Sequence, residues 1–139
     1  MKHETQNIQE VHTLAAQLVE TLIDARVVLL QGELGAGKTT FTQGVAKALG
    51  INKLVRSPTY TLVNVYSVAH PRIDQLVHVD LYRLALVNEQ ELKQIGLDEL
   101  VRNARSLVMI EWPERLEKPV PGLTLHFALK GDVYTVEYK

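Results

Sequence analysis

Residues 32–39, GELGAGKT, match the pattern G-x-x-x-x-G-K-T, which constrains this chain more than any other feature of its sequence. Glycines in such a loop let the backbone turn tightly around an anion, so that successive N–H groups point at phosphate oxygens. The helix that follows the loop adds the positive end of its dipole. The apolar run at 26–31 and the amphipathic stretch at 38–50 supply the required strand and helix. The pattern therefore predicts a site for a nucleotide polyphosphate.

Two side chains of this loop have specific expected roles. Lys38 is expected to reach the β- and γ-phosphates, and the hydroxyl of Thr39 is expected to ligate Mg²⁺. The other contacts to phosphate are expected from backbone N–H groups. The predicted nucleotide-binding residues of the loop are Glu33, Leu34, Gly35, Ala36, Gly37, Lys38, Thr39 and Thr40.

Two acids follow apolar runs and are candidates for the metal and for catalysis. Asp80 comes after LVHV, and Glu111 comes after LVMI. A phosphate-loop site needs an acidic partner for Mg²⁺ at the end of a neighbouring strand, and parallel strands bring such ends together. One acid is expected to help hold the metal, directly or through water. The other is expected to orient the attacking water or to complete the metal shell. The sequence leaves open which acid does which, and either position also suits a solvated acid.

Further polar residues have weaker signals. The loop at 57–61, SPTYT, offers hydroxyls for a γ-phosphate or its metal, and Thr61 is the predicted switch residue. The arginines at 56, 83 and 115 are candidates for neutralising transition-state charge, although most arginines are surface residues. Trp112 fits either a cover over the nucleotide or a packed core position. His78 lies inside an apolar strand and is interpreted as a satisfied core histidine.

The rest of the chain alternates strands and helices. Predicted helices lie at 8–23, with Asn7 and Glu10 as a capping box, and at 88–96, with Asn88 as its cap and Gly96 as its stop. Further strands are predicted at 62–67, 76–80 and 106–111, and a C-terminal hairpin turns at Gly131 and Asp132. The expected fold is a single α/β P-loop NTPase domain, 1–139, with a mixed sheet. That sheet is expected to be parallel at its centre, with an antiparallel edge hairpin and helices on both faces.

Composition removes several kinds of function. The chain of 139 residues has no cysteine, which excludes disulfides, thiolate metal sites and a cysteine nucleophile. Fifteen Lys and Arg against sixteen Asp and Glu give a net charge of -1, so no strong nucleic-acid affinity of its own is expected. The N-terminus lacks the apolar core of a signal peptide, and no apolar run approaches the ~20 residues that span a bilayer. A cytoplasmic protein is expected.

The type of nucleotide and its use follow partly from missing patterns. No N-K-x-D-type guanine-reading signature occurs, so nothing points to GTP. No large insertion supplies a lid and acceptor site, which weakens the case for a small-molecule kinase. An ATPase, a small-molecule kinase and a non-hydrolytic ATP-sensing interaction module remain as hypotheses.

Several stretches together resemble the TsaE (YjeE) family of small bacterial P-loop ATPases. They lie, in this order, at 32–44, 55–66, 78–84, 91–100 and 107–116, and SPTYTLV, DLYRL and EWPE are more specific than the phosphate loop. The resemblance implies a Mg²⁺-dependent ATPase that assists formation of N6-threonylcarbamoyladenosine at position 37 of tRNAs. It further implies binding to the TsaD–TsaB heterodimer, which transfers the group, and contact with tRNA only indirectly through that complex.

The resemblance also assigns roles to single residues. It implies that Asp80 is the Walker B-like acid needed for hydrolysis and that Glu111 is a second acid of the metal shell. It implies that Thr61 is the switch-loop hydroxyl and that Trp112 lies close to the nucleotide. The N-terminal segment departs from the Ser-x-x-x-Thr pattern usual in the family, because Asn7 and Val11 occupy those positions. No nucleotide contact through that threonine is carried over.

Overall fold

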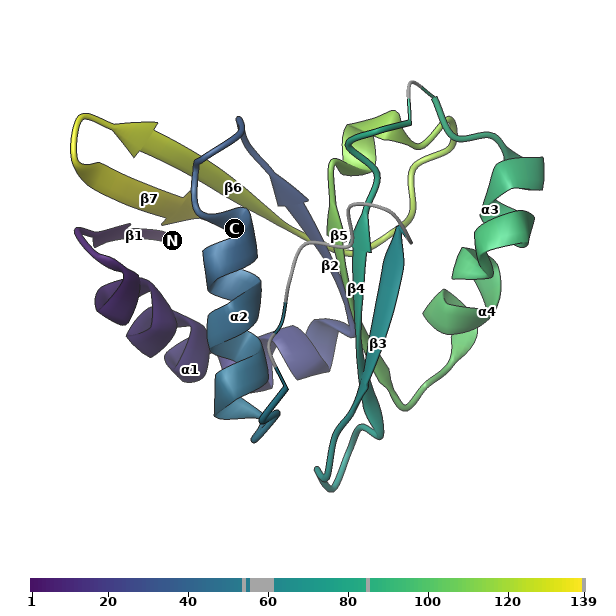
Figure 1. Ribbon diagram of the computed structural model, residues 1–139, viewed down its shortest axis with the longest axis horizontal. Coiled ribbons are helices and arrows are strands. Elements are labelled where there is room, and N and C mark those ends of the chain that lie inside the picture. The colour runs from purple at the N-terminus through teal and green to yellow at the C-terminus, as the bar shows by residue number, and fades with distance from the viewer. Residues whose placement is uncertain (54, 56–61, 85, 139) are drawn as a thin grey trace.

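A seven-stranded mixed sheet runs through the centre of the protein (Figure 1). This computed structural model describes residues 1–53, 55, 62–84 and 86–138. The strands are β1 (Lys2–Thr5), β2 (Val27–Gln31), β3 (Val63–Ser67), β4 (Gln75–Asp80), β5 (Ser106–Glu111), β6 (Leu123–Lys130) and β7 (Val133–Glu137). The helices are α1 (Ile8–Ala25), α2 (Lys38–Ala48), α3 (Glu89–Ile95), α4 (Leu97–Arg102) and the short 3-10 turn η1 (Pro113–Arg115).

The strand order is β1-β7-β6-β2-β5-β4-β3. Strand β2 pairs in parallel with both β5 and β6, and β4 pairs in parallel with β5. The remaining pairs, β6 with β7, β7 with β1 and β3 with β4, are antiparallel. The predicted mixed sheet, parallel at its centre and antiparallel at its edge, is confirmed. The carboxyl end of β2, where the phosphate loop begins, therefore lies between two parallel neighbours.

Strand β1 was not predicted from the sequence. Its four residues, KHET, are polar and too few to show an apolar period. They become a strand by pairing with β7 in the register Lys2↔Glu137 to Thr5↔Tyr134. The N-terminal ammonium of Met1 donates to the carbonyl of Tyr138, which holds the two ends of the chain together.

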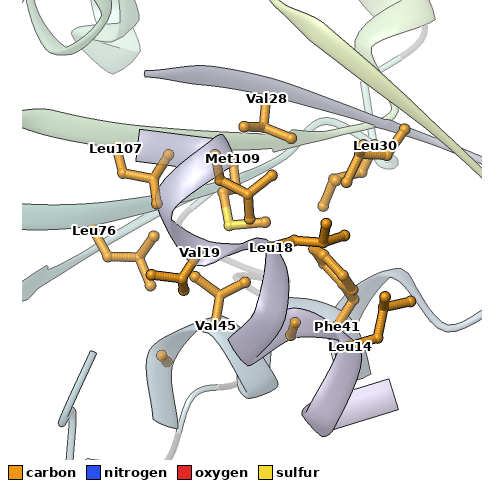
Figure 2. Packing of buried hydrophobic residues seen from close by; sticks show 14 of the residues in the cluster. Leu14, Leu18, Val19, Val28, Leu30, Phe41, Val45, Leu76, Leu107 and Met109 are labelled. Atoms are coloured by element: carbon orange, nitrogen blue, oxygen red, sulfur yellow. The ribbon is translucent and has the colours of Figure 1, made fainter. Parts of the chain in front are cut away.

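Helices cover both faces of the sheet, as expected. Figure 1 shows α1 and α2 on one side and α3 and α4 on the other. Alternation along the strands sends successive side chains to opposite faces, so each face has its own apolar cluster. Figure 2 shows the larger cluster, in which Leu14, Leu18 and Val19 of α1 meet Phe41 and Val45 of α2. Facing them lie Val28, Leu30, Leu76, Leu107 and Met109 from three strands.

The predicted helix boundaries follow from local capping. The side chain of Asn7 accepts a hydrogen bond from the backbone N–H of Glu10 at 2.9 Å, and Asn88 accepts from Glu91 at 2.9 Å. Gly96 ends α3 in the left-handed conformation, as predicted, but a further helix, α4, begins directly after it and was missed. No helix in the described part of the chain is both long enough and apolar enough to cross a membrane.

Candidate nucleotide site

The phosphate loop connects β2 to α2 through backbone conformations that require glycine. Gly32 has φ 151° and Gly37, the cap of α2, has φ 103°. A Cβ atom on Gly32 would stand 2.5 Å from the carbonyl oxygen of Phe127 in the neighbouring strand β6. Within the loop, the N–H of Ala36 donates to the carbonyl of Glu33 at 3.1 Å, which closes the turn. This turn leads directly into α2, so the positive end of the helix dipole lies at the loop.

A cavity of about 400 Å³ lies beside this loop. Its lining contains Leu34, Gly35, Gly37, Lys38, Thr39, Thr40, Asp80, Glu111 and Trp112, all of which are predicted site residues. Residues from the loop, from α2 and from the ends of β4 and β5 therefore converge, as the carboxyl ends of parallel strands do in open α/β sheets. The other two predicted loop residues are not part of this lining, because Glu33 is exposed and the side chain of Ala36 packs in the core. Their predicted role is through the backbone.

Lys38 is a buried charge of the cavity, with 4% of its surface exposed. Its Nζ donates to the carbonyl of Gly32 at 2.5 Å and lies 3.9 Å from the centre of the Trp112 ring. Burial lowers the pKa of Lys38, and the carboxylates of Glu111, Glu114, Asp80 and Glu33 oppose that shift only in part. A polyphosphate would supply this ammonium with the negative partner that the burial favours.

Glu111 is a nearly buried carboxylate, 3% exposed, at the end of β5. Thr39 Oγ1 lies 3.2 Å from Glu111 Oε2 and 3.4 Å from Oε1. Asp80 stands opposite Glu111 in the register of β4 with β5, so the two acids share one face at the same end of the sheet. One oxygen of Asp80 accepts from the backbone N–H of Tyr82 at 3.0 Å.

His78 belongs to this group, which its sequence position did not indicate. It is fully buried, and its Nε2 lies 2.5 Å from Oε2 of Glu111. Its Nδ1 is buried and has no hydrogen-bond partner in the part of the chain that the structure describes. His78 is a core histidine, as predicted, and Glu111 satisfies one of its ring nitrogens. The sequence did not show this partner, because the bond joins two strands, and spacing along one strand does not show which residue stands on the next.

Trp112 adopts the left-handed conformation, with φ 60° and ψ 49°, which is rare for a bulky side chain. Such strain of about 1–3 kcal/mol is found mostly where function needs it. The indole packs 5.0 Å from the ring of Tyr82, and the guanidinium of Arg115 stands 5.5 Å from it. Trp112 and Tyr82 line the cavity together with Lys38.

The donor set fits a metal held partly by a nucleotide. Among residues 1–53, 55, 62–84 and 86–138, no group of three or more histidine and acidic side chains is arranged to hold a metal ion alone. The hydroxyl of Thr39 and the carboxylate of Glu111 are hard oxygen donors in contact at the phosphate loop. Mg²⁺ is commonly held by one or two protein oxygens together with phosphates and waters. The residues present therefore suit Mg²⁺ bound with a nucleotide.

The sequence matches the family model "Threonylcarbamoyl adenosine biosynthesis protein TsaE" over residues 5–136. This chain belongs to the TsaE family. The tRNA threonylcarbamoyladenosine biosynthesis protein TsaE of Bacillus subtilis is 35% identical over 130 residues, covering 94% of this chain and 77% of that protein. The protein of the same name from Treponema pallidum is 40% identical over 118 residues, covering 85% and 80%. The crystal structure of Bacillus subtilis YdiB superposes with a TM-score of 0.73 and 29% identity, covering 99% of this chain and 83% of that one.

Membership of the TsaE family makes the unusual N-terminus of this chain informative. Asn7 caps α1, and Val11 is 4% exposed within the core cluster under that helix. The two positions that depart from the usual family pattern therefore serve helix capping and packing here. Neither residue lines the cavity beside the phosphate loop.

Some cavity residues of this TsaE-family chain were missed or weakly indicated by the sequence. Tyr82 and Tyr134 line the cavity without having been predicted, and Arg83 lines it although it was only one of three candidate arginines. Tyr134 belongs to the C-terminal hairpin, and its ring would stand 3.5 Å from a Cβ on Gly37. No signal in the sequence connects β7 with the loop. Thr61 and Arg56 lie outside the described residues, so their predicted roles stay predictions.

Proposed function

We propose that this chain is the ATP-binding and ATP-hydrolysing subunit required for N6-threonylcarbamoyladenosine modification at position 37 of tRNAs. In this proposal, hydrolysis is coupled to turnover of the TsaD–TsaB heterodimer. The observation that carries it is the contact between Thr39 and Glu111 at 3.2 Å beside the phosphate loop, with Asp80 across the strand register. Family membership supports the connection to threonylcarbamoyladenosine synthesis.

Each group has a defined task in this proposal. Lys38 and the loop N–H groups hold the phosphates, and the hydroxyl of Thr39 and a carboxylate, Glu111 or Asp80, hold Mg²⁺ directly or through water. When bound, Mg²⁺ neutralises charge on the phosphate oxygens. Asp80 is less buried than Glu111 and lines the cavity, which suits it to orienting the attacking water.

A low rate in the absence of partners follows from the same geometry. Phosphoryl transfer requires neutralisation of transition-state charge and an ordered water-positioning group. Arg115 lies over the aromatic rings and donates to the carbonyl of Leu84, so its guanidinium is already engaged. We propose that the TsaD–TsaB heterodimer completes the site. With a net charge of -1, this chain is expected to contact tRNA only indirectly through those partners. A cytoplasmic location, where tRNA is modified, is part of the proposal.

The test is to measure ATP turnover and multiple-turnover tRNA modification with and without TsaD–TsaB. The wild type is compared with Lys38→Ala, Asp80→Ala and the control Glu99→Ala, an exposed acid on α4. We expect stimulation by the partners for wild type and control, loss of nucleotide binding in Lys38→Ala, and binding without hydrolysis in Asp80→Ala. Absence of both stimulation and partner binding would refute the proposal. Transfer of phosphate to a metabolite faster than hydrolysis would indicate a kinase. Normal modification by Asp80→Ala would indicate an ATP-sensing module.

A further inference from the structure

We propose that His78 is a positioning residue of this site, which holds the Glu111 carboxylate in the orientation that it needs toward Mg²⁺ and nucleotide. The inference rests on the proposed function and extends it to a residue in the middle of β4. His78 is not among the described residues that line the cavity, and its Nε2 lies at the carboxylate of Glu111, which does line it.

The two donors around Glu111 restrict one of its oxygens. Oε2 lies 2.5 Å from Nε2 of His78 and 3.2 Å from the hydroxyl of Thr39. Among the described residues, Oε1 contacts Thr39 at the longer distance of 3.4 Å. The terminal torsion of a glutamate is broad, so a carboxylate without a partner can rotate. A bond from His78 to Oε2 limits this rotation and so fixes the direction in which Oε1 points.

The hydrogen-bond pattern also assigns the proton on the ring. A carboxylate can only accept, so Nε2 must carry the hydrogen that it shares with Glu111. Within the described residues nothing accepts from Nδ1, and a hydrogen there would be a buried, unpaired N–H, which is unfavourable. The geometry therefore points to an imidazole that carries a hydrogen at Nε2.

Packing alone does not explain a histidine at this place. Its neighbours along β4 are Val77 and Val79, which are fully buried, and its partner in the register on β5 is Met109. An apolar side chain would fill such a position without burying polar atoms. Among the described residues, the imidazole has a hydrogen-bond partner at Nε2, which is Glu111. The histidine is therefore useful here because its Nε2 donates to that carboxylate. Removing the donor is expected to weaken metal-dependent steps and to leave the phosphate loop intact.

The experiment compares His78→Leu, which removes the donor, with His78→Gln, whose side-chain amide keeps an N–H. ADP affinity is measured by calorimetry in EDTA and across a Mg²⁺ titration. We expect His78→Leu to raise the Mg²⁺ concentration at half-maximal effect by about tenfold or more. Its affinity in EDTA should match the wild type, and His78→Gln should restore most of the Mg²⁺ response. An unchanged Mg²⁺ midpoint in folded His78→Leu would overturn the inference. Equal weakening of both variants with and without Mg²⁺ would also overturn it, because that pattern indicates a purely structural role.

A second measurement does not depend on the metal. Imidazole ¹⁵N spectra of the nucleotide-free wild type report which ring nitrogen carries the proton, and the signal lost in His78→Gln identifies His78 among the five histidines. We expect the proton on Nε2; a proton on Nδ1 would overturn the inference. Failure of the proposed function is separately visible. In that case Lys38→Ala would retain ADP affinity, or the wild type itself would show no Mg²⁺ response.

Discussion

Gly44 in the middle of α2 packs closely against α1, and we expect Gly44→Ala to destabilise the protein. A Cβ atom there would lie 2.8 Å from Cβ of Ala15 and 2.9 Å from Cα of His12. Both separations are more than about 0.5 Å short of the ~3.5 Å at which carbon atoms pack. The second atom belongs to backbone and cannot rotate away, so α2 must move away from α1.

Two opposing effects set the size of the change in the free energy of unfolding. Replacing glycine by alanine inside a helix is intrinsically favourable by about 1 kcal/mol. Inserting a methyl group into a fully packed contact costs about 1–3 kcal/mol. We therefore expect the free energy of unfolding to fall by about 1 kcal/mol. Because Lys38 and Thr39 form the first turn of α2, we also expect weaker nucleotide binding.

The assay is urea unfolding, followed by far-UV circular dichroism and by the fluorescence of Trp112, the one tryptophan of the chain. The matched control is Ala48→Gly, at an exposed position of the same helix, where only propensity acts. Propensity alone would make Gly44→Ala more stable and Ala48→Gly less stable. Because the packing clash outweighs propensity at Gly44, we expect both variants to be less stable than the wild type. A Gly44→Ala protein as stable as the wild type would refute the reasoning.

Three further predictions follow from other contacts. Lys38→Met should raise the free energy of unfolding of the nucleotide-free protein by about 1 kcal/mol, because burial of the ammonium outweighs the attraction of the surrounding carboxylates. The same variant should no longer bind nucleotide. Thermal unfolding without nucleotide checks the stability, and a variant less stable than the wild type would contradict the prediction. The guanidinium of Arg72 lowers the pKa of Glu20 below 4.5, so this pair stabilises the fold above about pH 4.5 and loses its effect as the pH falls through the folded pKa. Arg72→Ala should thus lower the melting temperature at pH 7, by an amount that shrinks in concentrated salt and vanishes in acid; a difference that is independent of pH would count against the pair. Tyr134→Ala should weaken ADP binding about two- to tenfold by removing the ring beside Gly37. Its Mg²⁺ midpoint should stay that of the wild type, and unchanged ADP affinity would show that the ring does not contact the nucleotide.

Much of the fold could be predicted because its signals are local. The caps Asn7 and Asn88 bond to backbone groups three residues away, so the helices that they begin are visible in the sequence. The apolar runs of β2, β4 and β5 are equally visible, since buried parallel strands need them. Two elements could not be predicted from the sequence, for a physical reason. Strand β1 is stabilised by pairing with β7 rather than by its own pattern, and α4 follows a glycine that ends α3.

The sequence by itself determined the phosphate loop and the two strand-end acids, because each depends on consecutive residues. Strand, glycine turn and helix follow one another directly, and an acid after an apolar run lies at a strand end wherever that strand sits in the sheet. Only the tertiary structure decided that Asp80 stands opposite Glu111, that His78 donates to Glu111 and that Tyr134 lies beside Gly37. These relations depend on strand order and register. Pairing between distant strands is set by how the whole sheet buries its two apolar faces, and that leaves no periodic trace in either segment.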